Sequence, residues 1–392
     1  MEYTVACNWD PELLDQIDYP EVKSVFGGLP NTIIASGRPS LAIKNCTENE
    51  VRSYIKRVHD KGWTFDFNMN STCLGNKEFT AEGRKEIMQY LEWVCSLGVD
   101  SLTISLPTLV EIVKKHFPSV KIKISTYQKI NSVAMAQQFE EMGADALMLS
   151  EHVNRDFNLI EAIRKSVKCK LILVANVGCI YGCPNLFSHA NSSSHGGTKG
   201  QKQSVFTEYY QLYCGLRRIK DPDELIKIRW IRPEDVSFYQ ELGVDMLKII
   251  ERNSATQALA ERVKAYHDRC YKGNLLLILG QILNAKKTIH KNLKDELKPN
   301  SLVDLRKALK FSSDCLSLSL PELLYLDNTK IPFDFIKGFQ NRNCASLSCK
   351  TCRYCHEVAE HCVSKVDPQV INSIMDSFIE NKKEVVDGSI LY

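Results

Sequence analysis

The sequence predicts an α/β fold: a TIM-like (β/α)8 barrel over residues 1–269, followed by a smaller helical domain over residues 270–392. Three observations lead to this prediction. Short apolar segments alternate with amphipathic ones as far as residue 269, and the alternation then stops. The tripeptide Gly-x-Asp precedes a short apolar segment three times, at Gly98, Gly143 and Gly243. An open, doubly wound sheet is the second choice, but no GxGxxG or P-loop motif supports it.

The predicted strands are short, apolar and separated by helices, as in a series of βα units. Nine segments fit this description, one more than an eight-stranded barrel needs. They are residues 3–7, 32–35, 64–70, 101–104, 120–124, 146–149, 170–175, 226–230 and 246–249.

Capping residues and glycines set the predicted helix boundaries. Asp10 and Pro11 open a helix over residues 10–26, because aspartate caps helices and proline is favoured in the first turn. Thr47 and Glu50 have the spacing of a capping box and begin a helix that runs to about residue 61. The other predicted helices span residues 80–97, 108–116, 132–142 and 158–166.

Two segments carry polar residues that the fold alone does not require. Residues 64–70 alternate in polarity, so Asp66, Asn68 and Asn70 share one strand face, which looks into a site or onto solvent. Residues 185–204 are rich in small and polar residues and are predicted as a long flexible loop; long loops in compact domains are often functional. The loop contains His189 and His195, which are expected to be solvated unless nearby thiols recruit them to a metal.

Composition places the chain among globular proteins. The 392 residues are 44% hydrophobic and 25% charged, with a net charge of +3 and no basic block typical of a nucleic-acid groove. Neither a signal peptide nor an apolar run of about 20 residues is present, so we expect a cytoplasmic protein without membrane contact. The fifteen cysteines are therefore interpreted as thiols and metal ligands rather than as disulfides.

The first cysteine group follows a predicted strand. Cys179 and Cys183 lie in a loop rich in glycine and polar residues just beyond residues 170–175, and Cys214 follows thirty residues later. Soft thiolates grouped on a loop suit an iron–sulfur cluster or zinc. A fourth ligand comes from a distant residue such as Cys7, Cys46 or Cys73, or one iron stays open for catalysis.

The second cysteine group lies in the C-terminal domain. Cys344, Cys349, Cys352 and Cys355 form a C-x4-C-x2-C-x2-C run, and Cys362 follows. Zinc usually takes two short pairs separated by a dozen or more residues, whereas C-x2-C-x2-C is typical of a [4Fe–4S] cluster. We therefore expect the last three cysteines of the run to share a [4Fe–4S] cluster with Cys344 or Cys362, and zinc remains the alternative.

The chain resembles peptidase family U32, the collagenase-like family, over about residues 1–255. The resemblance is carried by the segment of residues 150–156, the strand leading to Cys179, the paired cysteines, and the segment of residues 243–252. It implies a barrel that carries a [4Fe–4S] cluster. The better-understood branches of this family are oxygen-independent hydroxylases and enzymes that modify RNA bases or the ubiquinone ring.

The chain also departs from the family pattern. Leu171 and Ala175 stand where the family has a glutamate and a histidine, and Val236 stands where it has its fourth cysteine. Three residues separate Cys179 from Cys183, where the family has six. The C-terminal cysteine run lies outside the family core, so the family's substrate is not carried over to this chain.

The sequence thus predicts an iron–sulfur redox enzyme with two clusters. One lies at the barrel mouth, and the other, in the C-terminal domain, donates electrons to it or accepts electrons from it. We expect it to act on a small molecule or an RNA base and to use an electron donor such as a ferredoxin. In a barrel, chemistry belongs at the carboxyl ends of the strands. The catalytic candidates there are Glu151, His152 and Arg38; the candidates for substrate binding are Asn68, Asn70, Asn176, Arg229 and Glu251.

Two other classes of function stay open. A U32-type peptidase needs a nucleophile beside a base, or a metal-activated water, and the sequence shows no motif for either. A non-catalytic electron-transfer protein needs no deep pocket, whereas the polar face of residues 64–70 favours one.

Overall fold

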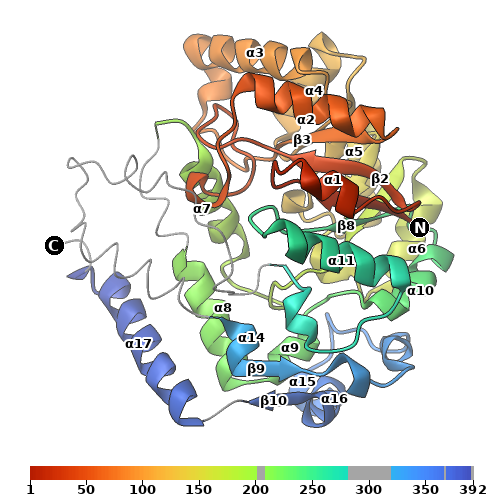
Figure 1. Ribbon diagram of the computed structural model, residues 1–392, viewed down its shortest axis with the longest axis vertical. Helices are drawn as coiled ribbons and strands as arrows, with labels where there is room; N and C mark the ends of the chain where they lie inside the picture. The colour runs from red at the N-terminus through yellow and green to blue at the C-terminus, as the bar shows by residue number, and fades with distance from the viewer. Residues whose placement is uncertain (201–207, 281–318, 366–367, 390–392) are drawn as a thin grey trace.

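The protein folds as a closed barrel of eight parallel strands surrounded by helices (Figure 1). The computed structural model describes residues 1–200, 208–280, 319–365 and 368–389. Each strand pairs with the next in chain order, and the last pairs with the first. The strands are β1 (Glu2–Ala6), β2 (Val22–Gly27), β3 (Thr64–Met69), β4 (Ser101–Ile104), β5 (Lys121–Ile124), β6 (Ala146–Met148), β7 (Lys170–Val174) and β8 (Met246–Ile249).

Helices follow the strands as a TIM-like barrel requires. The capping box of Thr47 and Glu50 is present, and Thr80 caps the following long helix. Among the described residues, four helices, α7 to α10, lie between β7 and β8, and this connection is the longest in the barrel. The helices are α1 (Glu12–Gln16), α2 (Glu48–Asp60), α3 (Ala81–Ser96), α4 (Pro107–His116), α5 (Val133–Glu141), α6 (Phe157–Ser166), α7 (Leu186–Gly197), α8 (Glu208–Lys220), α9 (Asp223–Lys227), α10 (Val236–Glu241) and α11 (Thr256–Asp268).

The repeated Gly-x-Asp phrase has the same structural role at each occurrence. Each glycine has a positive φ, between +81° and +93°, and turns the chain from a helix into β4, β6 or β8. The aspartates that follow, Asp100, Asp145 and Asp245, accept a backbone N–H from the preceding strand at 2.7–2.8 Å. Each also pairs with a basic side chain of a neighbouring helix. The repeat therefore ties three strand pairs together at the amino ends of the strands.

The start of the chain differs from the prediction. The predicted helix over residues 10–26 is wrong, because only α1 is helical there and β2 follows. Pro20 cannot continue a helix, and the apolar side chains that follow it are buried in the strand that pairs with β1. The predicted strand over residues 32–35 is also wrong; Thr32 forms only an isolated bridge with Thr198.

Two predictions in the β7–β8 connection are wrong as well. Residues 226–230 form no strand; α9 ends at Lys227, and the apolar side chains that follow pack into the core. The predicted flexible loop of residues 185–204 contains α7. Small side chains of α7 are buried, and Oγ of Ser194 accepts the N–H of Thr72 at 2.9 Å. Burial of small residues thus gives this polar sequence a helical structure.

A smaller C-terminal unit packs against the β7–β8 connection and lies at the lower edge of the barrel in Figure 1. Its last helix runs beside α8, and α16 packs on α9. Residues 281–318 of the predicted helical domain fall outside the described residues, and the domain boundary at residue 269 stays a prediction. The elements of the unit are α14 (Leu320–Leu323), β9 (Leu324–Leu326), α15 (Cys349–Cys352), α16 (Tyr354–Cys362), β10 (Val363–Lys365) and α17 (Pro368–Val386).

Within the described ranges, none of the helices has the length and apolar character needed to cross a membrane.

Candidate active site and metal centre

A polar pocket opens at the carboxyl ends of the barrel strands. It takes side chains from the ends of β3, β6 and β8 and from the loops that follow β2, β5 and β7. The structure therefore brings together residues that the sequence places far apart. Four of them are site candidates predicted from the sequence, and two basic residues join them: Arg38, Asn68, Asn70, Glu151, Lys248 and Arg252.

Several polar atoms in this pocket have no protein partner. The Oδ1 atoms of Asn68 and Asn70 and Nη1 of Arg252 are buried without a hydrogen bond in the described part of the chain. Buried polar groups are rarely left unsatisfied, because losing water without a replacement partner costs about 1–3 kcal/mol each. The pocket therefore matches a polar ligand that supplies both donors and an acceptor.

Glu151 is held as a buried carboxylate. Nζ of Lys129 lies 2.6 Å from its Oε1, and Oγ1 of Thr126 donates to its Oε2 at 3.0 Å. Burial raises the pKa of Glu151, but Lys129 and the adjacent His152 outweigh it, and the net pKa lies below the usual value. Glu151 is thus ionised at neutral pH and available as a proton acceptor at the pocket wall.

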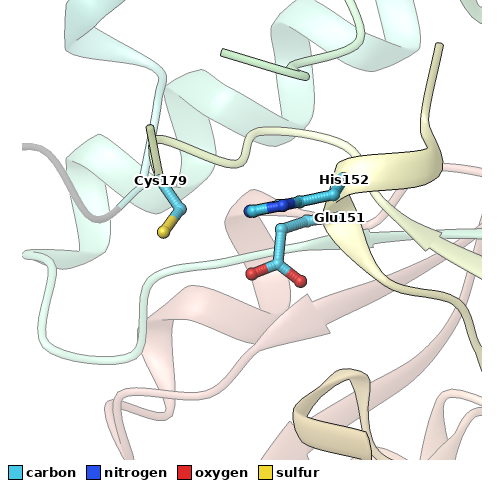
Figure 2. Close-up of side chains that lie close together, drawn as sticks. All are labelled: Glu151, His152 and Cys179. Carbon is cyan, nitrogen blue, oxygen red and sulfur yellow. The ribbon is translucent and has the colours of Figure 1, made fainter. Parts of the chain in front are cut away.

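His152 extends from the short helical turn after β6 toward Cys179 (Figure 2). Ligand atoms of Glu151, His152 and Cys179 all lie within 4.8 Å of one another. Burial lowers the pKa of His152, so its imidazole is neutral at pH 7. Its Nε2 atom is buried and has no hydrogen-bond partner among the described residues. A neutral imidazole nitrogen without a partner beside a thiol is a donor suited to a metal.

The three predicted thiols of the barrel lie close to one another. Burial raises the pKa of Cys179 to about 12, and the nearby Glu151, Cys214 and Cys183 contribute to the rise. Burial likewise raises the pKa of Cys183, with a further contribution from Cys214. The low-dielectric surroundings thus oppose free thiolates, and a cation or metal bound there reverses this preference.

A buried guanidinium shows that this thiol group suits a negatively charged metal complex. Arg218 is fully buried; its Nη1 donates to Sγ of Cys214 at 3.4 Å and its Nη2 donates to the carbonyl of Gly178. Its Nε is unsatisfied, and no carboxylate pairs with it in the described ranges. Buried charge needs a partner, and thiolates around an iron–sulfur cluster provide one. Cys179, Cys183 and Cys214 therefore fit the cluster that the resemblance implies.

Of the distant cysteines considered as a fourth ligand, Cys7 and Cys46 lie near each other. Cys7 is buried beside Trp9, and its surroundings include Tyr54 and Cys46 rather than the thiols of the mouth. Sγ of Cys73 accepts the N–H of Gly75 in the loop after β3. Among the described residues, the carboxylate of Glu151 and the imidazole of His152 are donors grouped with the Cys179 thiol.

Arg38 is positioned by an ion pair at the rim of the pocket. Its Nε donates to Oε1 of Glu251 at 2.8 Å, and its Nη1 donates to the hydroxyl of Tyr127 at 3.1 Å. Burial lowers its pKa, but Glu251 and Tyr127 outweigh burial and raise it overall. Gly37 has φ of +73°, and a Cβ there would lie 2.6 Å from Oδ1 of Asn70. Glycine at this position therefore allows Arg38 and Asn70 to share the rim.

Lys248 and Arg252 were not among the predicted site residues. The Nζ atom of Lys248 lies 3.6 Å from the sulfur of Met148 and 3.8 Å from the ring centre of Phe26. The pKa of Lys248 is lowered to about 7, chiefly by burial; Asp66 opposes this shift, and Lys123, Arg252 and Arg38 add to it. The amine is therefore largely neutral slightly above pH 7. A lysine inside the apolar 246–249 segment was the sequence signal that could have revealed it.

Three predicted substrate-binding residues do not line the pocket: Asn176, Arg229 and Glu251, which pairs with Arg38 at its rim. Asn176 is fully buried, and its amide bonds backbone groups of Ile250 and Ile278, so it braces the loops after β7 and β8. Arg229 stacks on the ring of Tyr181 at 3.9 Å and faces the C-terminal unit. Arg38 and Arg229 therefore do not line the same pocket.

The C-terminal cysteines line a second pocket between α9 and α16. Cys344, Cys349, Cys352 and Cys355 all contribute to it. Cys362 does not; its Sγ donates to the carbonyl of Val358 at 3.1 Å on the buried side of α16.

The comparisons with known proteins each cover about two thirds of this chain. The family described as peptidase family U32 matches residues 22–275. The uncharacterized protease MJ1657 of Methanocaldococcus jannaschii is 30% identical over 259 residues, which are 65% of this chain and 74% of that protein. The solved structure of the U32 peptidase Mk0906 is 20% identical and aligns with a TM-score of 0.47, covering 63% of this chain and 92% of its own. The family match ends before the C-terminal cysteine run.

Proposed function

This chain belongs to peptidase family U32, and on that basis we propose that it is an iron–sulfur redox enzyme that modifies a polar or anionic substrate. The single observation that carries the proposal is the group of Glu151, His152 and Cys179 at the wall of the strand-end pocket, with two more thiols beside it. Thiols next to proton-transfer groups and a polar pocket suit redox chemistry on a bound substrate better than a purely structural metal site.

The residues of the pocket have different roles in this proposal. An iron–sulfur cluster held by Cys179, Cys183 and Cys214 would supply one-electron chemistry. Arg38 and Arg252 provide positive charge for a carboxylate, phosphate or enolate group of the substrate. Glu151, ionised and fixed by Lys129, accepts a proton from a group in the pocket.

The remaining polar residues orient the substrate. Asn68 and Asn70 offer their unpartnered amide oxygens to N–H or O–H donors, as a nucleobase or a hydroxylated ring presents them. The neutral amine of Lys248 accepts a proton at the floor of the pocket near pH 7. We propose an oxygen-independent hydroxylation or a related modification, with a small molecule or an RNA base as substrate and a ferredoxin-like protein as electron donor.

A peptidase remains the second candidate, because a thiol beside an imidazole also describes a cysteine peptidase. The raised pKa of Cys179 argues against it, since a nucleophilic cysteine needs a lowered pKa. Neither the neutral His152 nor the ionised Glu151 offsets the rise in the pKa of Cys179 that burial causes. The electrostatics of the site therefore do not favour Cys179 as a nucleophile.

The experiment that tests the proposal compares the two candidates on one preparation. Anaerobically purified, dithionite-reduced protein is titrated with uridine 5′-monophosphate and with 4-hydroxybenzoate while its paramagnetic resonance spectrum is recorded, and its activity on casein is measured in parallel. The proposal expects a thiolate-dependent iron–sulfur signal that at least one probe shifts, and no casein cleavage. Iron-free protein that cleaves casein, with loss of cleavage in Cys179→Ala, would establish the peptidase instead.

A further inference from the structure

The C-terminal unit gathers four thiols around one pocket. Cys349 and Cys352 lie at the two ends of the one-turn helix α15, and Cys355 lies in the first turn of α16. Arg353, between the two helices, has φ of +53°, a left-handed conformation that reverses the chain direction. This turn lets both short helices present their thiols to the pocket that Cys344 completes.

The packing around the pocket holds this arrangement against the barrel. The hydroxyl of Tyr354 donates to the carbonyl of Phe335 at 2.8 Å, and Arg342 stacks on the Tyr354 ring at 4.3 Å. On the other side, Nδ1 of His356 lies 3.0 Å from a carboxylate oxygen of Asp223 in α9. The thiols are therefore fixed by contacts from both the C-terminal unit and the β7–β8 connection.

Two buried guanidinium groups near Cys355 have no acidic partner among the described residues. Arg155 and Arg229 are 3% and 4% exposed, and no carboxylate pairs with either within the described ranges. Arg155 donates to the carbonyls of Ile226 and Trp230, and its Nε is unsatisfied. Nε and Nη1 of Arg229 are also buried without a hydrogen-bond partner.

The charge of these arginines requires a nearby anion. An unpaired buried charge costs several kcal/mol, and stacking on aromatic rings offsets about 1–2 kcal/mol of it. Arg155 is 4.5 Å from the ring centre of Trp230 and 4.6 Å from that of Phe339. Arg229 also lies against the Phe339 ring, at 5.8 Å, and this ring lines the thiol pocket. The missing anion therefore belongs at the thiol pocket.

We propose that Cys344, Cys349, Cys352 and Cys355 bind a [4Fe–4S] cluster that exchanges electrons with the thiol group at the barrel mouth. Four thiolates around a doubly positive cubane leave a net charge of about −2, which balances the two guanidiniums. Zinc in four thiolates has the same net charge, so the choice of metal rests on spacing: C-x2-C-x2-C winds around one cubane, whereas zinc takes separated pairs.

A contiguous set of contacts joins the two thiol groups. Arg229 lies close enough to Cys355 to affect its pKa, and it stacks on Tyr181 at 3.9 Å. Tyr181 stands between Cys179 and Cys183 in the chain, and its ring centre lies 5.4 Å from that of His152. Arg229 and Tyr181 are therefore positioned between the two groups.

The exposed side of the C-terminal group completes the relay. Cys349 is exposed to solvent, so a reduced ferredoxin-class protein can dock there. One electron leaves the reduced donor, enters the C-terminal cluster and passes to the barrel cluster, so the donor is oxidised and the barrel cluster reduced by one electron. This relay rests on the proposed function, whereas the C-terminal metal site does not.

The site is tested by metal content in matched variants. Parent protein, Cys349→Ser, Cys362→Ser and Cys270→Ser are purified anaerobically and assayed for iron, sulfide and zinc. Because Cys349 and Cys270 are both exposed, neither substitution opens a cavity in the core. We expect Cys349→Ser to lose about four iron and four sulfide atoms per chain, the content of one cubane, and both other variants to keep the parent content. The proposal is overturned if the parent contains stoichiometric zinc that is lost in Cys349→Ser, or if the iron content of Cys349→Ser equals that of the parent.

The relay is tested separately from the barrel chemistry. A variant with Cys179→Ser and Cys183→Ser is expected to keep the C-terminal iron and its paramagnetic signal. Fully reduced parent protein is expected to show broadened signals from two interacting clusters, and Cys349→Ser a narrow one. Arg229→Gln removes a positive charge beside Cys355 and is expected to lower the midpoint potential of the C-terminal cluster. If Cys349→Ser loses all of the iron that the parent protein contains, the relay and the barrel cluster are refuted, whereas the C-terminal site is supported. If the parent shows two non-interacting signals and Arg229→Gln leaves the midpoint potential unchanged, the relay alone is refuted.

Discussion

Lys248 provides the most quantitative prediction, because its amine is buried in the barrel without a carboxylate partner in the described ranges. Its pKa falls from the ordinary 10.5 to about 7, with burial as the largest cause. In the unfolded chain the same lysine stays protonated up to about pH 10.4. Folding therefore releases a proton between these values, and the free energy of unfolding rises with pH across this window.

The size of the effect follows from the shift. At 1.36 kcal/mol per pKa unit, the buried ammonium destabilises the native state by roughly 4–5 kcal/mol below pH 7, as an upper bound. The penalty falls to about 2 kcal/mol at pH 9 and disappears above the unfolded pKa. Lys248→Met keeps the shape of the side chain and removes the charge. The gain in stability of this variant over the parent is thus expected to shrink by about 2–3 kcal/mol from pH 6 to pH 9.

The assay is urea unfolding of parent, Lys248→Met and Lys121→Met under anaerobic conditions at pH 6 and pH 9. Lys121 is the matched control because it is an exposed lysine at the start of β5. Comparing each variant with the parent at both pH values removes any pH-independent effect of the methionine. The control is expected to differ from the parent in free energy of unfolding by the same amount at both pH values. If Lys248→Met also differs from the parent by the same amount at both pH values, Lys248 is not a buried neutral amine.

An independent measurement avoids unfolding altogether. At pH 7.5 an amine of pKa about 7 is roughly three-quarters neutral, against about 0.1% for an ordinary lysine. Competitive acetylation followed by peptide mass spectrometry is therefore expected to show a reactivity of Lys248 that levels off above pH 8, after correction for access. Reactivity that keeps rising to pH 10 would mean that the amine is an ordinary cation.

Three further predictions concern the same pocket. Glu151→Gln leaves Lys129 buried and unpaired, and it is expected to lower the free energy of unfolding in urea by about 3–5 kcal/mol. Adding Lys129→Met is expected to restore stability. If the single and double variants are equally stable, Lys129 and Glu151 have no stabilising interaction. His152→Ala is expected to change the g-values of the reduced barrel cluster and its iron retention, whereas His195→Ala on α7 leaves both unchanged; identical spectra would exclude His152 as a donor. Arg38→Ala is expected to weaken binding of an anionic probe roughly 10- to 100-fold in the resonance titration, and an unchanged affinity would remove Arg38 from the anion site.

The sequence predicted the barrel because its signals are local. Apolar segments of strand length and the glycines that end helices depend on neighbours in the chain, and they located seven of the eight strands. The strand β2 was missed because Val22–Gly27 follows a helical pattern without a strong break other than Pro20. The capping residues and the apolar spacing favour a helix in this region, but residues 22–27 form a strand because they pair with β1 and β3.

The site was only partly predictable from the sequence. Parallel strands put their carboxyl ends on one side, which is why Asn68, Asn70 and Glu151 were expected to lie together, and they line one pocket. The direction of Lys248 into the barrel depends on register, and the position of Arg229 depends on how the C-terminal unit packs. Such long-range contacts leave no trace in local spacing.

The most direct test of the central claim, an iron–sulfur site at the barrel mouth, is the iron and acid-labile sulfide content of the anaerobically purified chain, measured beside a variant with Cys179, Cys183 and Cys214 all changed to serine. We expect about eight iron and eight sulfide atoms per parent chain, two cubanes' worth, and about four of each in the variant, with loss of one paramagnetic signal. An equal iron content in the two proteins, or zinc in place of iron in the parent, would contradict it.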